Sequence, residues 1–187
     1  MRPSKNKLTT ASLVASRFNF APMISLSSIS EEILAISSNT AKRKARDNLL
    51  PVPVFRLSES QKAPWLILFD HLVEYVECLD AQSQFELFFP IYTQAIAVPF
   101  SQLTTTQLLM TKFQSESSLP LVELTTEYFG LSASLAKRKA RNDEFPFEVF
   151  RKSNSQKSPW FVSIESFVSY VETTATESRK DWLRMQC

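Results

Sequence analysis

Hydrophobic and polar positions follow the same order twice along the chain. Each time, a short apolar stretch with helical spacing is followed by a turn and by a segment rich in lysine and arginine. Two β-rich runs with a polar stretch between them come next, and an amphipathic segment closes the unit. The pattern predicts a helix, a tight turn, a second helix, a hairpin and a closing helix.

The recurrence is visible in the residues themselves. AKRKAR stands at 41–46 and again at 136–141, and SQK-x-PW stands at 60–65 and again at 155–160. Aligned without a gap, the two segments share roughly 28 identities in about 70 positions, far above chance. We call residues 8–77 the first copy and 103–172 the second copy. The sequence therefore predicts two domains, at 1–78 and 103–187, joined by an apolar, proline-broken connector at 79–102.

The first two helices of each copy have recognisable ends. In the first copy, Ser28 or Ser30 is expected to cap a short first helix, because serine hydroxyls accept from free backbone N–H groups. In the second copy the equivalent helix is expected at 125–129. Gly130 follows it, where a helix ends with a positive φ. A helix, a tight turn and a helix form the helix-turn-helix pattern.

The rest of the unit completes a small winged domain. Ser37 or Ser38 caps the second helix, in which alanines four residues apart share one face and the cations cover the remainder. Residues 51–56 and 65–68 predict a hairpin with a polar tip, and Asp70 is expected to cap the closing helix. The expected fold class is α+β, mainly α: a tandem repeat of two small winged helix-turn-helix domains.

Composition excludes several function classes. The single glycine cannot build a glycine-rich phosphate loop. One histidine and two cysteines outside any C-x-x-C pair cannot build a structural zinc cluster, and the acidic residues form no credible catalytic pair. We expect no enzyme activity, no cofactor and no metal. His71 is expected on the surface, while Trp65 and Trp160 are expected to anchor the hairpins in the core. No segment has the length and apolarity of a membrane span, so we expect a cytoplasmic, nucleoid-associated protein.

Charge points to a polyanionic partner through its distribution. The net charge is only +2, but the two AKRKAR segments hold eight of the 21 basic residues, leaving 13 basic against 19 acidic residues elsewhere. Such a helix can place lysines on phosphates and an arginine on a guanine edge in the major groove, while the hairpin tips contact the backbone. The predicted DNA-binding residues are Asn39, Thr40, Lys42, Arg43, Lys44, Arg46, Arg56, Ser60, Gln61 and Lys62, with Ser134, Lys137, Arg138, Lys139, Arg141, Arg151, Ser155, Gln156 and Lys157 in the second copy.

The motif order also resembles a known family. L-S-x-x-x-A-K-R-K-A, then V-F-R, then S-Q-K-x-P-W and an apolar helix, is similar to the PrtN family of pyocin activator proteins. The second copy resembles this family over 104–182, whereas the first departs upstream of Ser38 and has Ala35 where glycine is expected. The resemblance implies a DNA-binding transcription activator found with phage-derived genes. The unit also resembles, more distantly, excisionase and MerR-like winged domains.

Three function hypotheses follow. The first is a sequence-specific regulator of phage-derived or mobile-element genes, in which two recognition helices read two half-sites as a pseudo-dimer within one chain. The second is an excisionase-like factor that bends DNA for a recombinase. The third is a protein-interaction module that docks through residues 85–100. The expected partners are double-stranded DNA and RNA polymerase or a recombinase. The operator, the sign of regulation, direct or inverted half-sites and the oligomeric state stay open.

Overall fold

A computed structural model describes residues 9–80, 104–114, 117–153, 155 and 158–186. The first copy contains, in order, α1 (Thr10–Arg17), β1 (Met23–Ser25), α2 (Leu26–Ile29), α3 (Ser38–Arg46), β2 (Leu66–Leu68) and α4 (Phe69–Asp80). The second contains α5 (Thr105–Phe113), β3 (Ser118–Pro120), α6 (Leu121–Phe129), α7 (Ala133–Arg141), β4 (Val149–Arg151), β5 (Trp160–Ser163) and α8 (Ile164–Gln186). The predicted connector lies almost entirely outside the described residues.

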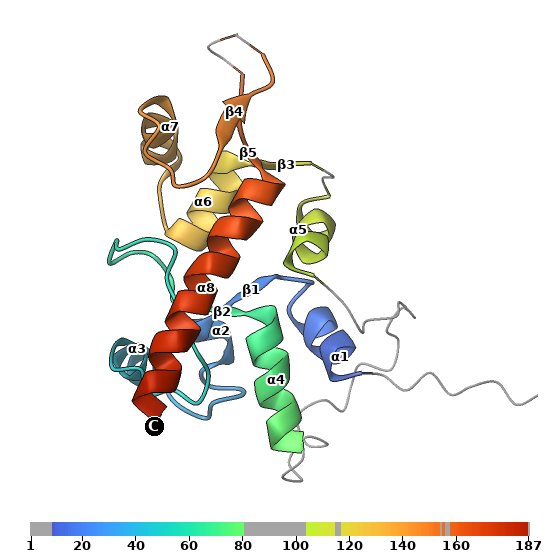
Figure 1. Cartoon of the computed structure of the whole chain (residues 1–187), viewed down its shortest axis with the longest axis vertical. Coiled ribbons are helices and arrows are strands. Elements are labelled where there is room, and N and C mark those ends of the chain that lie inside the picture. Colours follow the sequence, from blue (N-terminus) through green and yellow to red (C-terminus); the bar gives the residue numbers. More distant parts are fainter. Residues whose placement is uncertain (1–8, 81–103, 115–116, 154, 156–157, 187) are drawn as a thin grey trace, which may run out of the picture.

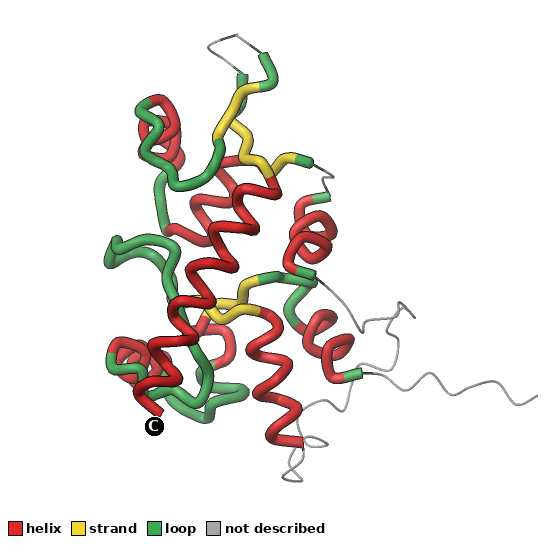
Figure 2. The backbone as a smooth tube through the Cα atoms, in the orientation of Figure 1, coloured by secondary structure: helices red, strands yellow, loops and turns green. Residues whose placement is uncertain are grey.

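The two copies are small mixed domains whose elements follow the same order, except that β4 has no strand counterpart in the first copy (Figure 2). The predicted mixed, mainly helical tandem pair of small domains is confirmed. β1 pairs antiparallel with β2, with Ile24 opposite Ile67. In the second copy β5 lies between β3 and β4, again antiparallel, with Val162 opposite both Leu119 and Val149. The helices outweigh these short strands, so each sheet serves mainly as a base on which the helices pack.

The turn before each basic helix is built as the residue types require. The side chain of Ser37 accepts a hydrogen bond from the backbone N–H of Thr40, which caps α3. Gly130 ends α6 with φ +63°, in the left-handed region that favours glycine. Ala35, at the same position of the first copy, also has a positive φ, of 52°. Both predicted turns are therefore present, one of them with a strained alanine.

Three expected helix starts were wrong. α2 begins at Leu26, so Ser28 lies inside it and Ser30 follows its last residue. α6 begins at Leu121, four residues before the predicted start. α4 begins at Phe69, and Asp70 occupies its first turn. In each case a buried apolar residue opens the helix, so core packing, rather than a polar cap, decides where it begins.

Some strands and helices were not expected from the pattern. β1, β3, α1 and α5 were missed. The predicted hairpin of the first copy is reduced to one isolated bridge between Phe55 and Leu66, while the second copy forms the full pair β4–β5. The residue corresponding to Pro53 is Glu148, whose backbone carbonyl accepts from the N–H of Ser163 and so extends the contact of this segment with β5.

The long helix α8 packs against residues of both copies. It starts in the second copy and descends past the first, next to α3 and α4 (Figure 1). One buried apolar cluster combines Met23, Leu57 and Leu68 of the first copy with second-copy residues such as Leu121 and Phe167. The two domains therefore share a hydrophobic core and are not independent units on a tether.

His71 is buried at 7% exposure, so the expectation of a surface position was wrong. It lies in the first turn of α4, where Phe69 and Leu72 are also buried. Burial, with the nearby Arg179 cation of α8 as a second cause, lowers the pKa of His71 from 6.5 to about 4. The Arg179 cation of the second copy thus changes the electrostatic environment of a side chain in the first.

Candidate DNA interface

The two basic helices bury their alanines and expose their cations. Ala41 and Ala45 are 0% and 1% exposed, and Ala136 and Ala140 have the same values. Small residues let each helix lie close to its neighbour, which turns the lysines and arginines outward. The exposed cations of the two helices are Lys42, Arg43, Arg46, Lys137, Arg138 and Arg141. In the described part of the chain none of these six forms an ion pair with a carboxylate.

The remaining predicted residues of these helices lie at their edges. Asn39 and Ser134 are exposed, whereas Thr40 is half-buried with its hydroxyl 2.9 Å from that of Ser37. Lys44 and Lys139 are also half-buried. Lys139 pairs with Glu144 at 3.5 Å, while the position corresponding to Glu144 in the first copy is Leu49.

Each hairpin tip is braced by its arginine. The Arg56 guanidinium lies 5.4 Å from the ring centre of Trp65 and donates to the backbone carbonyl of Ser60. Arg151 lies 4.2 Å from the ring centre of Trp160 and donates to the carbonyl of Ser155 at 3.4 Å. These arginines therefore shape the tips and also present a cation there.

Both tryptophans pack against the apolar clusters while half-buried, as expected of core anchors with one face covered by an arginine. The Ser60 hydroxyl accepts from the backbone N–H of Lys62 at 3.3 Å, leaving the Gln61 and Lys62 side chains exposed. Gln156 and Lys157 lie outside the described residues.

A basic cleft of ≈ 590 Å³ lies between α2, α3 and the hairpin tip of the first copy. Four cations from two elements converge on it, together with serine hydroxyls and an amide. Its polar and charged lining residues are Lys42, Arg46, Arg56, Lys62, Ser25, Ser27 and Gln61. None of the residues that line this cleft is acidic. Such a set of donors without a carboxylate suits a phosphate-bearing ligand.

The second copy keeps the four cationic positions of this basic cleft as Lys137, Arg141, Arg151 and Lys157. The two cleft serines are replaced by Pro120 and Val122. Sequence reasoning missed Ser25 and Ser27, because only the fold brings the end of β1 and the start of α2 against the hairpin tip. The cations, by contrast, could be found from the recurring motifs.

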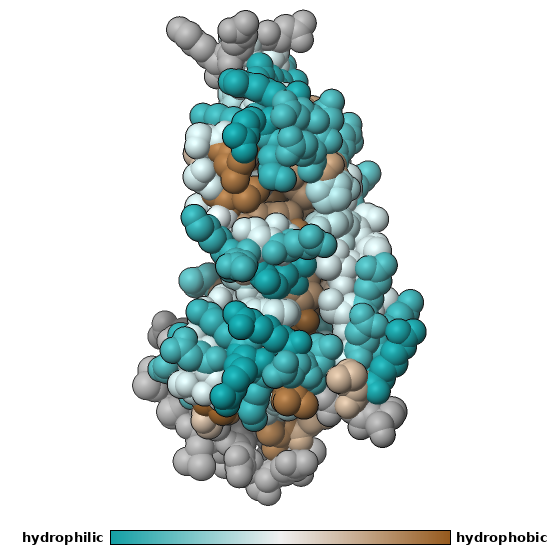
Figure 3. All heavy atoms as spheres, turned by 90° about the vertical axis from the view of Figure 1, so that its left-hand side faces the viewer, coloured by the Kyte–Doolittle hydropathy of each residue, from teal (hydrophilic) through white to brown (hydrophobic). Residues whose placement is uncertain are grey.

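Both basic helices lie on one side of the molecule. In Figure 1, α7 lies at the upper left and α3 at the lower left. The 56–65 loop projects on the same side at a level between the two helices. Figure 3 turns this side to the viewer and shows hydrophilic side chains at those three levels. One extended ligand on this side can therefore meet both helices.

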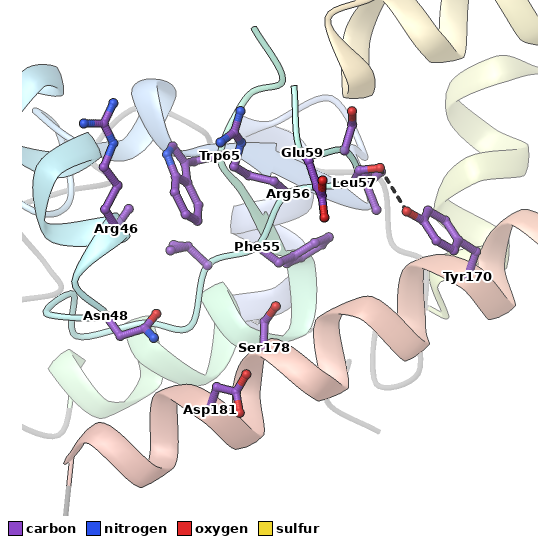
Figure 4. A pocket seen from close by; sticks show the side chains of 13 residues that line it. Arg46, Asn48, Phe55, Arg56, Leu57, Glu59, Trp65, Tyr170, Ser178 and Asp181 are labelled. Atoms are coloured by element: carbon purple, nitrogen blue, oxygen red, sulfur yellow. Dashed lines mark hydrogen bonds between the residues drawn. The ribbon is translucent and has the colours of Figure 1, made fainter. Parts of the chain in front are cut away.

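A second cleft, of ≈ 430 Å³, belongs to the join between the copies (Figure 4). It is lined by the end of α3, the start of the hairpin tip and α8. At its edge the Tyr170 hydroxyl donates to the backbone carbonyl of Leu57 at 2.9 Å. Asp181 and Glu59 contribute negative charge to its lining, so it lacks the purely cationic character of the basic cleft.

Two further features can be recognised by residue type, namely metal-binding clusters and membrane-spanning helices. Within the described ranges, no group of three or more histidine, cysteine or acidic side chains could hold a metal ion. Among the same residues, no helix is long and apolar enough to cross a membrane.

Comparison with known proteins agrees with the repeat. The family model described as pyocin activator protein PrtN matches residues 10–84 and, separately, residues 105–178. No curated protein and no solved structure matches the chain. The two matches together cover most of the sequence and coincide with the two copies. The chain accordingly belongs to the PrtN family of pyocin activators, proteins that act in transcription, and carries two tandem copies of the family's domain.

Proposed function

We propose that the protein activates transcription by binding double-stranded DNA sequence-specifically through both copies. In each copy the helix pair α2–α3 or α6–α7 acts as a helix-turn-helix with the following hairpin as its wing. The basic helix enters the major groove, and the cleft beside it receives the adjoining sugar–phosphate backbone.

The observation that carries this proposal is the basic cleft beside α3. Lys42 and Arg46 come from the helix, whereas Arg56 and Lys62 come from the hairpin tip, and no carboxylate lines the space between them. A helix exposed merely to solvent has no need for a second element that supplies cations toward the same space. A phosphodiester backbone running between helix and tip would use all four.

Base readout is assigned to the outermost side chains of the helices. Arg43 and Arg138 are exposed and lie between the buried alanines, on the part of the helix surface that faces away from the core. An arginine placed there can donate two hydrogen bonds to a guanine edge. Asn39 and Ser134, four residues earlier on the same face, are proposed to contact the neighbouring base pair.

The genes controlled are proposed to be phage-derived, as the pyocin activator family suggests. Activation also requires a contact with the transcription machinery, and RNA polymerase is the proposed protein partner. The predicted docking segment at 85–100 lies outside the described residues and has no part in this proposal.

Mapping of bound DNA across the genome of the source organism, followed by titration of purified duplexes, tests the proposal. If each copy contacts about four phosphates, log affinity against log salt concentration has a slope near −7 on duplex DNA. A slope shallower than about −2 would contradict binding by both copies.

A matched pair of variants assigns the binding to the basic cleft. Lys42→Ala with Arg46→Ala is expected to weaken binding at least tenfold and to flatten the salt slope by about 2. Lys180→Ala with Arg184→Ala removes two exposed cations from α8 and serves as the control. Equal effects of the two pairs would show that only overall charge matters.

A further inference from the structure

The contacts between the copies are not reciprocal. Tyr170 of α8 donates to the carbonyl of Leu57, but the residues at the corresponding positions are Tyr75 and Lys152. Tyr75 packs against the first copy's own cluster, and Lys152 is exposed. In a pair related by a two-fold axis, each contact occurs twice with the roles exchanged. The two copies are therefore packed head to tail.

The ion pair between the copies leads to the same conclusion. Arg179 of α8 meets Glu74 of α4 at 2.9 Å. The residue at the position of Glu74 in the second copy is Ser169, which carries no charge to form a symmetric ion pair.

The surface of the first copy that is buried against the second has no counterpart of the same chemistry. Met23, Leu57 and Leu68 lie in the shared apolar cluster. Their positions in the second copy are occupied by Ser118, Lys152 and Ser163. The Lys152 ammonium lies 4.4 Å from the ring centre of Phe161 and covers it. The second copy therefore lacks the apolar side chains with which the first copy joins the shared cluster.

The figures give the direction of this arrangement. In Figure 1, α4 descends from β2 and α8 descends from β5, so the closing helices of both copies run the same way. The basic helices α3 and α7 lie on the same side of these closing helices. A translation with some rotation relates the copies, and both basic helices approach one ligand with the same polarity.

From this packing we infer that the DNA target consists of two half-sites in direct orientation at one fixed spacing. The inference rests on the proposed function. Two-fold related helix-turn-helix proteins read inverted repeats, because the symmetry of the protein mirrors that of the operator. A head-to-tail pair presents the same helix in the same direction twice. It therefore recognises the same half-site sequence twice along one DNA strand.

Selection of duplexes with the full chain tests the orientation. The pool carries a random central segment of about 30 base pairs, long enough for two half-sites one or two turns apart. The expected result is that the selected duplexes contain one half-site sequence twice, in the same orientation. The protein should then bind a duplex with two direct half-sites at least tenfold more tightly than a duplex with inverted half-sites or with a single half-site.

The outcomes separate the two proposals. Enrichment of an inverted pair, or equal affinity for direct and inverted duplexes, would overturn the direct-repeat inference while DNA binding stands. If instead no half-site sequence is enriched and the protein binds all duplexes equally, the proposed function is overturned.

A second series tests the fixed spacing. Insertions of about 5 and of about 10 base pairs between the two direct half-sites should both reduce the affinity to that for a duplex with one half-site. The reason is that α8 holds the two copies in one packed unit. Recovery with the longer insertion, which restores the face of the DNA, would show a flexible tether and overturn the fixed spacing.

Discussion

Gly130 lies against the backbone of Lys62, so that the hairpin tip of the first copy touches the turn between α6 and α7 of the second. A Cβ added to Gly130 would lie 2.9 Å from the carbonyl carbon of Lys62 and 3.4 Å from the Cα of Ala63. The only glycine of the chain therefore stands where both a positive φ and a close backbone approach require it.

Gly130→Ala should destabilise the protein by about 2–4 kcal/mol, since it adds left-handed strain to a clash between the copies. Ala35→Gly is the matched control at the equivalent turn, which already carries a Cβ. Removing strain there should change stability by less than about 1 kcal/mol, with a gain expected. Urea unfolding of the full chain measures both, and similar losses for the two would contradict the contact.

Trp182→Phe should cost about 1–3 kcal/mol. The indole N–H donates to the backbone carbonyl of Leu50 at 2.7 Å, and Leu50 is buried, so the variant leaves that carbonyl unsatisfied. Arg179→Gln breaks an ion pair whose side chains are 38% and 57% exposed, and should cost less than about 1 kcal/mol. Chemical unfolding that ranks the ion pair above the indole would show that charge, rather than α8 packing, joins the copies.

Stability should fall as the pH is lowered from 6.5 towards 4. The pKa of His71 is about 4 in the folded protein against 6.5 ordinarily, so the unfolded chain binds more protons in this window. The resulting loss is on the order of 3 kcal/mol at the lower end. His71 is the only histidine, so His71→Leu should remove this part of the slope in unfolding free energy against pH. If the slope of the unfolding free energy against pH is the same in His71→Leu as in the wild type, a group other than His71 causes the pH dependence.

Arg43→Ala and Arg138→Ala should each cost about 1–3 kcal/mol on the selected DNA site and relax its specificity. Lys62→Ala should weaken binding to selected and random duplexes nearly equally, because its exposed ammonium at the hairpin tip is assigned to phosphate. Anisotropy titrations on both duplexes compare the variants. Equal losses on both DNAs for the arginine variants would show that neither arginine reads a base.

Two triple variants test whether both copies bind. Replacing Lys42, Arg43 and Lys44 by alanine, or Lys137, Arg138 and Lys139, should weaken binding at least tenfold in each case, since each removes three cations from one proposed DNA-binding helix. Titration of both on the selected site checks this. Wild-type affinity for one of them would make that copy a scaffold.

The repeat, the basic helices and the turn glycine could be predicted from the sequence because each depends on local chemistry. Cations recur at equal spacing, Ser37 caps its own helix, and Gly130 supplies its own φ. β1 and β3 could not be predicted, because three-residue strands show no alternation and their partners lie more than 40 residues away.

The pKa of His71 and the cleft position of Ser25 depend on elements distant in the sequence. Arg179, over a hundred residues away, helps set the pKa of His71, and the hairpin tip encloses Ser25. The path of α8 across the first copy has the same origin: only the first copy carries the leucines and the Leu50 carbonyl that receive it. Tertiary packing, and not local propensity, decided each of these features.

The apolar cluster shared by the two copies also affects how occupancy of DNA responds to protein concentration. A regulator assembled from separate subunits loses its partner on dilution, and its occupancy falls faster than its concentration. Here the two copies share one chain and one apolar cluster, so the pairing of their proposed DNA-binding helices survives at any dilution at which the chain is folded. The occupancy of a site with two half-sites is then expected to rise hyperbolically with protein concentration. A few molecules in a cell can then give a graded response.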